Sequence, residues 1–161
     1  MTGARDQSPK SDSVWTAIRA EAWSEAENEP YLNKFMTEAI LKCRRLEEAL
    51  SRILTCKLSS DCLSPELLRS SIDRVFSEAA SVGPAIRRDL EAVRDRDPTA
   101  RGFLTPFLFF KGFQALQAYR VANWYWERDR HLLALHFQNR ISEVFGVDIH
   151  PAARIGSGVL I

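Results

Sequence analysis

Residues 149–161 decide the class of fold. They read Ile149-His-Pro-Ala-Ala-Arg, then Ile155-Gly-Ser-Gly-Val-Leu, then Ile161, so an isoleucine recurs at every sixth position. Aliphatic residues at this interval, the second followed by glycine, are typical of the hexapeptide repeat of a parallel β-helix, where each hexad forms one flat side of a three-sided coil. Two hexads and one residue are less than one turn, and a solenoid buries a core only when several turns stack. The pattern predicts an incomplete β-helix that begins over residues 147–161.

Working back from this segment, residues 14–146 carry a helical pattern. Apolar residues recur at intervals of three and four, which places them on one face of a helix. The chain also contains helix boundary signals: Ser64-Pro65 and Thr105-Pro106 are typical of helix starts, Gly83-Pro84 interrupts the pattern, Pro98 ends a helix, and Gly146 is a C-cap. We therefore predict an all-α domain of roughly six to eight helices over 14–146. The faces expected to be buried comprise Trp15, Ile18, Ala22, Ala26; Leu32, Phe35, Met36, Ile40; Leu46, Leu50, Ile53, Leu54; Leu68, Ile72, Val75, Phe76, Ala79; and Ile86, Leu90, Val93.

The most apolar helix is predicted to begin at Thr105-Pro106 and to run to about Trp126. A helix with so few polar positions is usually central in its domain or buried at an interface. Its polar residues form a stripe at a spacing of three: Lys111, Gln114, Gln117, Arg120 and Asn123.

Length, composition and charge exclude several classes of protein. The chain has 161 residues, 45% of them hydrophobic and 27% charged, with a formal net charge of +1. This is an ordinary globular composition, and no basic face points to nucleic acid. No apolar run reaches the length that spans a membrane. Residues 1–13 are polar, so we expect a disordered tail and no secretory signal.

The three cysteines, Cys43, Cys56 and Cys62, have neither the number nor the spacing of a disulfide framework or a zinc site. We expect them to be small buried or half-buried groups in a cytoplasmic protein that binds no metal.

Three segments resemble the bacterial and plant serine O-acetyltransferases. They are Arg96-Asp97-Pro98; Thr105-Pro106 through Lys111-Gly112-Phe113 to Arg120; and Asp148-Ile149-His150-Pro151 with Ile155-Gly156. The resemblance covers nearly the whole chain from Val14. It implies a multi-helix amino-terminal domain that leads into the first coil of a left-handed parallel β-helix.

The resemblance also implies an activity. The family transfers an acetyl group from acetyl-CoA to the hydroxyl of L-serine, giving O-acetylserine for cysteine biosynthesis, with acetyl-CoA as co-substrate and no bound cofactor. A histidine near pKa 6.5 suits the role of general base towards a hydroxyl, and a carboxylate partner stabilises the imidazolium that forms.

Carried over by position, Asp148 corresponds to the catalytic aspartate that orients the histidine, and Asp97 to an aspartate that binds substrate serine. The family's Asp-His pair, which supplies the histidine, would follow Ile161, so we expect this fragment to be inactive alone. The resemblance further implies a hexamer built as a dimer of trimers. It also implies binding of O-acetylserine sulfhydrylase through a tail that is absent here.

Simpler interpretations of both aspartates stay open. Asp97 could form an ion pair with Arg94, Arg96 or Arg101 on a solvated face, and Asp148 could cap a turn. The charged run from Arg87 to Arg101 is interpreted as such a solvated face.

His131 and His136 are interpreted as surface or interface packing residues, and His150, which lies in the third matching segment, is not assigned the role of base. An alternative function is a non-catalytic helical module for oligomerisation, and a helical DNA-binding regulator is a third, less favoured one. We expect neither a nucleic-acid nor a membrane partner.

Overall fold

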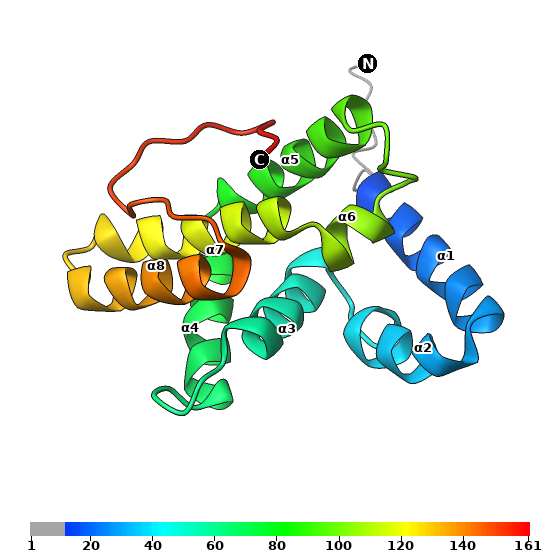
Figure 1. The fold of residues 1–161 in the computed structure, drawn as a ribbon, viewed down its shortest axis with the longest axis horizontal. Coiled ribbons are helices and arrows are strands. Elements are labelled where there is room, and N and C mark those ends of the chain that lie inside the picture. Colours follow the sequence, from blue (N-terminus) through cyan, green and yellow to red (C-terminus); the bar gives the residue numbers. More distant parts are fainter. Residues whose placement is uncertain (1–11) are drawn as a thin grey trace, which may run out of the picture.

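The computed structural model describes residues 12–161 and confirms an all-α domain (Figure 1). Of the tail expected over 1–13, only Asp12 and Ser13 lie inside the described residues, and Ser13 already begins the first helix. The described residues form eight α-helices and one π-helical turn: α1 (Ser13–Asn28), α2 (Pro30–Met36), the π-helix η1 (Thr37–Leu41), α3 (Leu46–Leu58), α4 (Pro65–Glu78), α5 (Val82–Arg96), α6 (Leu104–Phe109), α7 (Lys111–Trp126) and α8 (His131–Phe145).

Helix α7 lies at the centre, as its apolar sequence predicted. It packs antiparallel to α8 and contacts α4, α5 and α6, whereas α1 and α2 extend to the right in Figure 1. Ala115, Ala118 and Val121 of α7 are completely buried. Their small side chains allow close approach of the neighbouring helices, which places α7 inside the core.

Side-chain caps explain several helix boundaries. The carboxylate of Asp12 accepts the Trp15 N–H at the start of α1, and the Ser64 hydroxyl accepts the Leu67 N–H at the start of α4. Both satisfy N–H groups that have no partner inside the helix. Gly146 has a φ of 71° after α8, which is the C-cap conformation that favours glycine.

The helix boundary predicted at Gly83-Pro84 lies slightly earlier in the chain, just before Val82. Helix α5 begins at Val82, so Gly83 and Pro84 both lie in its first turn. The first N–H groups of a helix have no partner inside the helix, so a proline there removes no hydrogen bond.

The single helix predicted from Thr105 to Trp126 is also wrong, because Phe110 divides it into α6 and α7. Side chains from elsewhere satisfy both ends of the short α6. Glu21 of α1 accepts the N–H groups of Phe103 and Leu104 at its start. Buried Gln114 donates to the carbonyls of Phe107 (3.1 Å) and Leu108 (2.7 Å) at its end. The Glu21 contacts span more than 80 residues of sequence, and the Gln114 contacts span six and seven, which is outside the spacing of three and four that marks one helical face.

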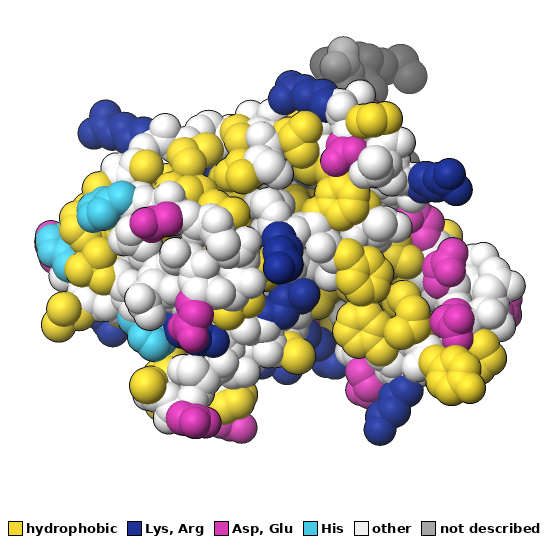
Figure 2. Space-filling model, viewed as in Figure 1, with side chains coloured by type: hydrophobic (Ala, Val, Ile, Leu, Met, Phe, Trp, Pro, Cys, Tyr) yellow, Lys and Arg dark blue, Asp and Glu magenta, His cyan; other side chains and the backbone are white. Residues whose placement is uncertain are grey.

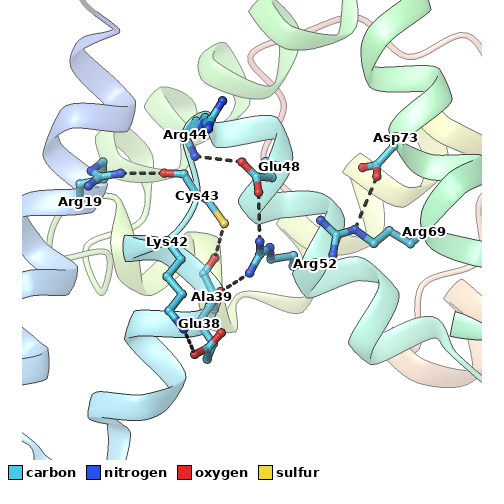
Figure 3. Close-up of polar contacts among 10 residues, drawn as sticks. All are labelled: Arg19, Glu38, Ala39, Lys42, Cys43, Arg44, Glu48, Arg52, Arg69 and Asp73. Atoms are coloured by element: carbon cyan, nitrogen blue, oxygen red, sulfur yellow. Dashed lines mark hydrogen bonds and ion pairs between the residues drawn. The ribbon is translucent and has the colours of Figure 1, made fainter. Parts of the chain in front are cut away.

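The junction between α1, η1 and α3 is held by arginine–carbonyl contacts (Figure 3). Arg19 of α1 donates to the Cys43 carbonyl at 2.7 Å, and Arg52 of α3 donates to the Glu38 carbonyl at 2.9 Å. Glu48 accepts the Arg44 N–H at 2.9 Å. The stripe predicted from Leu32 to Ile40 is buried only at its end: Met36 and Ile40 are inside, whereas Leu32 and Phe35 are about 40% exposed.

The cysteine prediction holds for one residue of three. Cys43 is buried and its thiol donates to the Ala39 carbonyl, whereas Cys56 and Cys62 are exposed. Burial raises the pKa of the Cys43 thiol. No helix among residues 12–161 is long and apolar enough to cross a membrane.

Residues 147–161 cross the α7–α8 pair and return towards α5 without forming a strand (Figure 1). In a β-helix each strand is paired with the coils above and below it, and this segment is shorter than one turn. It is instead held by side chains of α5 and α7, which are described below.

Candidate functional site

Asp97 lies at the carboxyl end of α5 and closes a tight turn. Its Oδ1 accepts the Thr99 hydroxyl at 2.7 Å and the Thr99 N–H at 2.8 Å. These two hydrogen bonds hold the pKa of the Asp97 carboxyl below its ordinary value of 3.8, with the hydroxyl bond contributing most. The carboxyl is therefore ionised at neutral pH, and its Oδ2 has no hydrogen-bond partner within residues 12–161.

The arginines next to Asp97 in sequence bond elsewhere. Arg94 pairs with Asp95 at 2.8 Å, and Arg96 donates to the Gly158 carbonyl at 3.0 Å. No ion pair joins Asp97 to Arg94, Arg96 or Arg101 in the described part of the chain.

Asp148 follows α8 and is exposed. Its Oδ1 accepts the side-chain amide of Gln138 at 2.7 Å. The carboxylate is thus oriented by α8 rather than by a turn of its own. Asp97 and Asp148 lie on different elements, and no hydrogen bond or ion pair joins them among residues 12–161.

His131 packs on an aromatic ring, as interpreted from the sequence, and so does His150. The rings of His131 and His150 lie 4.2 Å and 4.9 Å from the ring of Trp126, measured between centroids. His136 is half-buried on α8. No group of three or more possible metal ligands is found within the described residues.

The residue that sequence reasoning missed is Asp89. It was assigned to a solvated charged face, but it is completely buried. Its Oδ2 accepts Gln117 Nε2 at 3.0 Å, Arg120 Nε at 3.1 Å and Arg120 Nη2 at 2.6 Å. Its Oδ1 accepts the N–H groups of Gly158 (2.8 Å) and Val159 (3.0 Å). A local signal existed: position 89 lies three residues after Ile86, within the apolar face of α5.

The polar stripe of α7 therefore has a specific role. Gln114, Gln117 and Arg120 are buried. Gln117 and Arg120 bind Asp89, and Arg120 and Asn123 also bind the segment 151–159. Arg120 Nη2 donates to the Gly156 carbonyl at 2.8 Å, Asn123 donates to the Pro151 carbonyl at 2.8 Å, and the Tyr119 hydroxyl donates to the Ala153 carbonyl. Side chains of the helical domain thus bind the main chain of both hexads.

A polar pocket of about 320 Å³ opens beside this contact. Its walls come from the α4–α5 turn, from α5, from α7 and from the second hexad, and they include Arg88, Asn123, Trp124, Glu127 and Ser157. Neither Asp97 nor Asp148 lines it.

Comparison with known proteins agrees with the motifs. The family model described as "Serine acetyltransferase, N-terminal" matches residues 14–118, which is well over half of the chain. This chain belongs to the serine acetyltransferase family. The match begins at the expected start of the helical domain and covers Asp89 and Asp97.

Individual members of the serine acetyltransferase family are similar over most of the chain. Serine acetyltransferase 2 of Arabidopsis thaliana is 47% identical over 153 residues, which are 95% of this chain and 47% of that protein. A soybean serine acetyltransferase complexed with serine superposes with a TM-score of 0.89 at 45% identity, covering 91% of this chain and 60% of that one. A serine acetyltransferase in complex with CoA superposes with a TM-score of 0.88 at 44% identity, covering 90% and 61%.

The chain spans about half the length of the curated serine acetyltransferases it matches.

Proposed function

We propose that this chain is the helical domain and first hexapeptides of a cytoplasmic serine O-acetyltransferase that acetylates L-serine from acetyl-CoA for cysteine biosynthesis. The observation that carries the proposal is the match of residues 14–118 to the amino-terminal domain of this family. Similarity to structures that contain serine and CoA supports the choice of substrates.

The reaction joins the serine hydroxyl oxygen to the acetyl carbonyl carbon and breaks the thioester bond. An imidazole takes the hydroxyl proton, and CoA leaves as the thiol. In this scheme Asp148 holds that imidazole in its productive tautomer. The Asp148 side chain is exposed and already oriented by Gln138, so it is accessible to such a partner.

Asp97 is proposed to bind the ammonium group of substrate serine. It is ionised at neutral pH, its Oδ2 has no partner within residues 12–161, and Thr99 fixes its orientation. A carboxylate of fixed orientation gives a strong charge-assisted hydrogen bond to an ammonium group. None of the three histidines in the chain is assigned the role of general base: His131 and His150 pack on Trp126, and His136 is half-buried on α8.

The alternative, a module for oligomerisation, is favoured by one observation. Tyr31, Leu32 and Phe35 of α2 and Phe109 of α6 are 39–95% exposed apolar side chains, and Leu32 and Phe109 line one hollow. Figure 2 shows apolar surface gathered on this side of the molecule, over α2 and α6. An exposed patch of this kind marks a contact surface. We propose that it serves assembly of the hexamer, so both functions can belong to one protein.

The site assignment is tested in a complete enzyme. Residues 1–161 are joined to the part of the soybean enzyme that they do not cover, and serine-dependent CoA release is measured. Asp97→Asn is expected to raise the KM for L-serine, and Asp148→Asn to lower kcat, each by about 100-fold or more, as for other catalytic carboxylates. Asp95→Asn, two residues away on the exposed surface, is the control. Near-normal rates in either site variant remove that residue from the site.

A further inference from the structure

The two oxygens of the buried Asp89 carboxylate face different parts of the molecule. Oδ2 accepts three N–H groups from Gln117 and Arg120 inside the helical domain. Oδ1 accepts two main-chain N–H groups from Gly158 and Val159 in the second hexad. A carboxylate offers about four lone-pair positions, so five donors fill them all, and the three donors to Oδ2 share its two lone pairs.

The turn that meets Asp89 has a special conformation. Gly158 has a φ of 75°, and its N–H and that of Val159 both point at Oδ1. Successive N–H groups that converge in this way form a concave site for an anion. The neighbouring carbonyls are held too: Arg120 binds Gly156 and Arg96 binds Gly158.

We propose that Asp89 is a positioning residue that fixes the hexapeptide segment on the helical domain at the Gly156–Val159 turn, with Arg120 holding its carboxylate in place. This sets the path along which the β-helix leaves the helical domain. The inference concerns the fold of residues 82–161 and is independent of the proposed catalytic function.

Helix packing alone does not account for this arrangement. A buried ion pair between two helices can often be replaced by apolar side chains without loss of stability. An apolar residue at position 89 could pack α5 on α7, but it could not accept the N–H groups of Gly158 and Val159. The packing of α5 on α7 therefore does not require a carboxylate at position 89, whereas the N–H groups of Gly158 and Val159 require this acceptor.

The first experiment compares Asp89→Asn with the wild-type chain. The asparagine oxygen is expected to turn towards the charged Arg120, which leaves its NH₂ group facing two N–H donors. Amide hydrogen exchange at Gly158 and Val159, followed by NMR, is expected to accelerate about tenfold or more, because both N–H groups lose a hydrogen bond to a charged acceptor. Exchange in the middle of α7 and α8 stays unchanged. Asp95→Asn on the same helix is the matched control and is expected to behave as wild type.

A second variant leaves the helical core untouched. Val159→Pro removes one N–H donor to Asp89 Oδ1 and changes no residue of a helix. It therefore still tests the role of Asp89 if Asp89→Asn loses helicity by circular dichroism. Trypsin cleavage after the exposed Arg154 is expected to accelerate about tenfold in both variants, relative to cleavage in the 127–130 turn, because a held segment must open before cleavage. The inference is overturned if wild-type Gly158 and Val159 exchange as fast as an unstructured peptide. It is also overturned if Val159→Pro changes neither exchange at Gly158 nor cleavage at Arg154.

Discussion

The carboxylate of Glu21 on α1 accepts the main-chain N–H of Leu104 at the start of α6, at 2.8 Å and across 83 positions of sequence. It also accepts the N–H of Phe103. Glu21 thereby fixes the carboxyl end of the loop 97–103, whose other end carries Asp97. The first helix of the chain thus supports the loop that carries a proposed substrate-binding residue.

Gly102 is expected to tolerate no side chain. It has a φ of 85°, and a Cβ there would lie 2.5–2.7 Å from the Glu21 carboxylate. We predict that Gly102→Ala lowers the free energy of unfolding by about 2–3 kcal/mol, from left-handed strain and a displaced cap. Gly146 has a φ of 71° and open space around it. Gly146→Ala should therefore lower the free energy of unfolding only by the backbone strain of a left-handed alanine, about 1 kcal/mol. Urea unfolding measures both.

A double-mutant cycle isolates the contact. In a Glu21→Ala background the cost of Gly102→Ala should fall to that of Gly146→Ala. An unchanged cost would mean that Glu21 is not what excludes a side chain at position 102.

Thr99 is expected to control the ionisation of Asp97. Thr99→Val removes the hydroxyl donor, the larger cause of the lowered pKa, and keeps the main-chain N–H. The pKa of Asp97 should therefore rise towards its ordinary value of 3.8 without reaching it. A carbon-13 NMR titration of the Asp97 carboxyl measures this shift. A titration identical to that of the wild type would show that the hydroxyl bond is not formed in solution.

Acid should weaken the attachment of α1 to α5. Asp12 caps α1 and pairs with Arg87; burial raises its pKa, but hydrogen bonds from Arg87 and the Trp15 N–H outweigh this and lower it below 3.8. A lowered folded-state pKa gives stability that is complete above the unfolded-state pKa and is lost as pH falls through the folded-state value. Asp12→Asn should cost about 1 kcal/mol at pH 7, and this cost should fall as the pH drops below 3.8 and Asp12 of the folded protein becomes protonated. Urea midpoints across this range measure the difference. An equal cost throughout this range would contradict the assignment.

The apolar patch of Tyr31, Leu32, Phe35 and Phe109 should drive self-association. Replacing both Tyr31 and Phe35 by serine removes two aromatic side chains from the contact. By light scattering, the oligomer of this variant should therefore begin to dissociate at a protein concentration about tenfold higher, or more, than the oligomer of the wild type. Leu132→Ser, at an 86% exposed position on α8, is the control. If the wild-type chain is monomeric at all concentrations, the patch is not an interface for self-association.

The helices and most of their ends could be predicted from sequence because they depend on local signals. The Ser64-Pro65 start, the Gly146 end and the buried faces of α1 and α3 follow from capping chemistry and helical spacing. The break at Phe110 could not be predicted, because the carbonyls of Phe107 and Leu108 before it are capped by the side chain of Gln114. The start of the resulting short helix α6 is capped by Glu21 of α1, and neither contact follows from spacing within a helix.

The residues of the candidate site were likewise predicted only in part from the sequence. Asp97 and Asp148 were identified by family motifs, and their ion-pair or turn-capping alternatives were judged from neighbours in sequence. The partners found in the structure are Thr99 and Gln138. Asp89 was missed because its donors come from α7 and from residues about 70 positions away. Only the apolar face around position 89 pointed to its burial.

The most direct test of the account is serine-dependent CoA release by residues 1–161, alone and joined to the uncovered part of the soybean enzyme. The account predicts turnover by the joined protein that requires both L-serine and acetyl-CoA. It predicts none by the 161-residue chain alone, which should still show a helical circular dichroism spectrum. A folded joined protein without activity would contradict the proposed function. Turnover by the chain alone would place the general base among His131, His136 and His150 and contradict the assignment of the site.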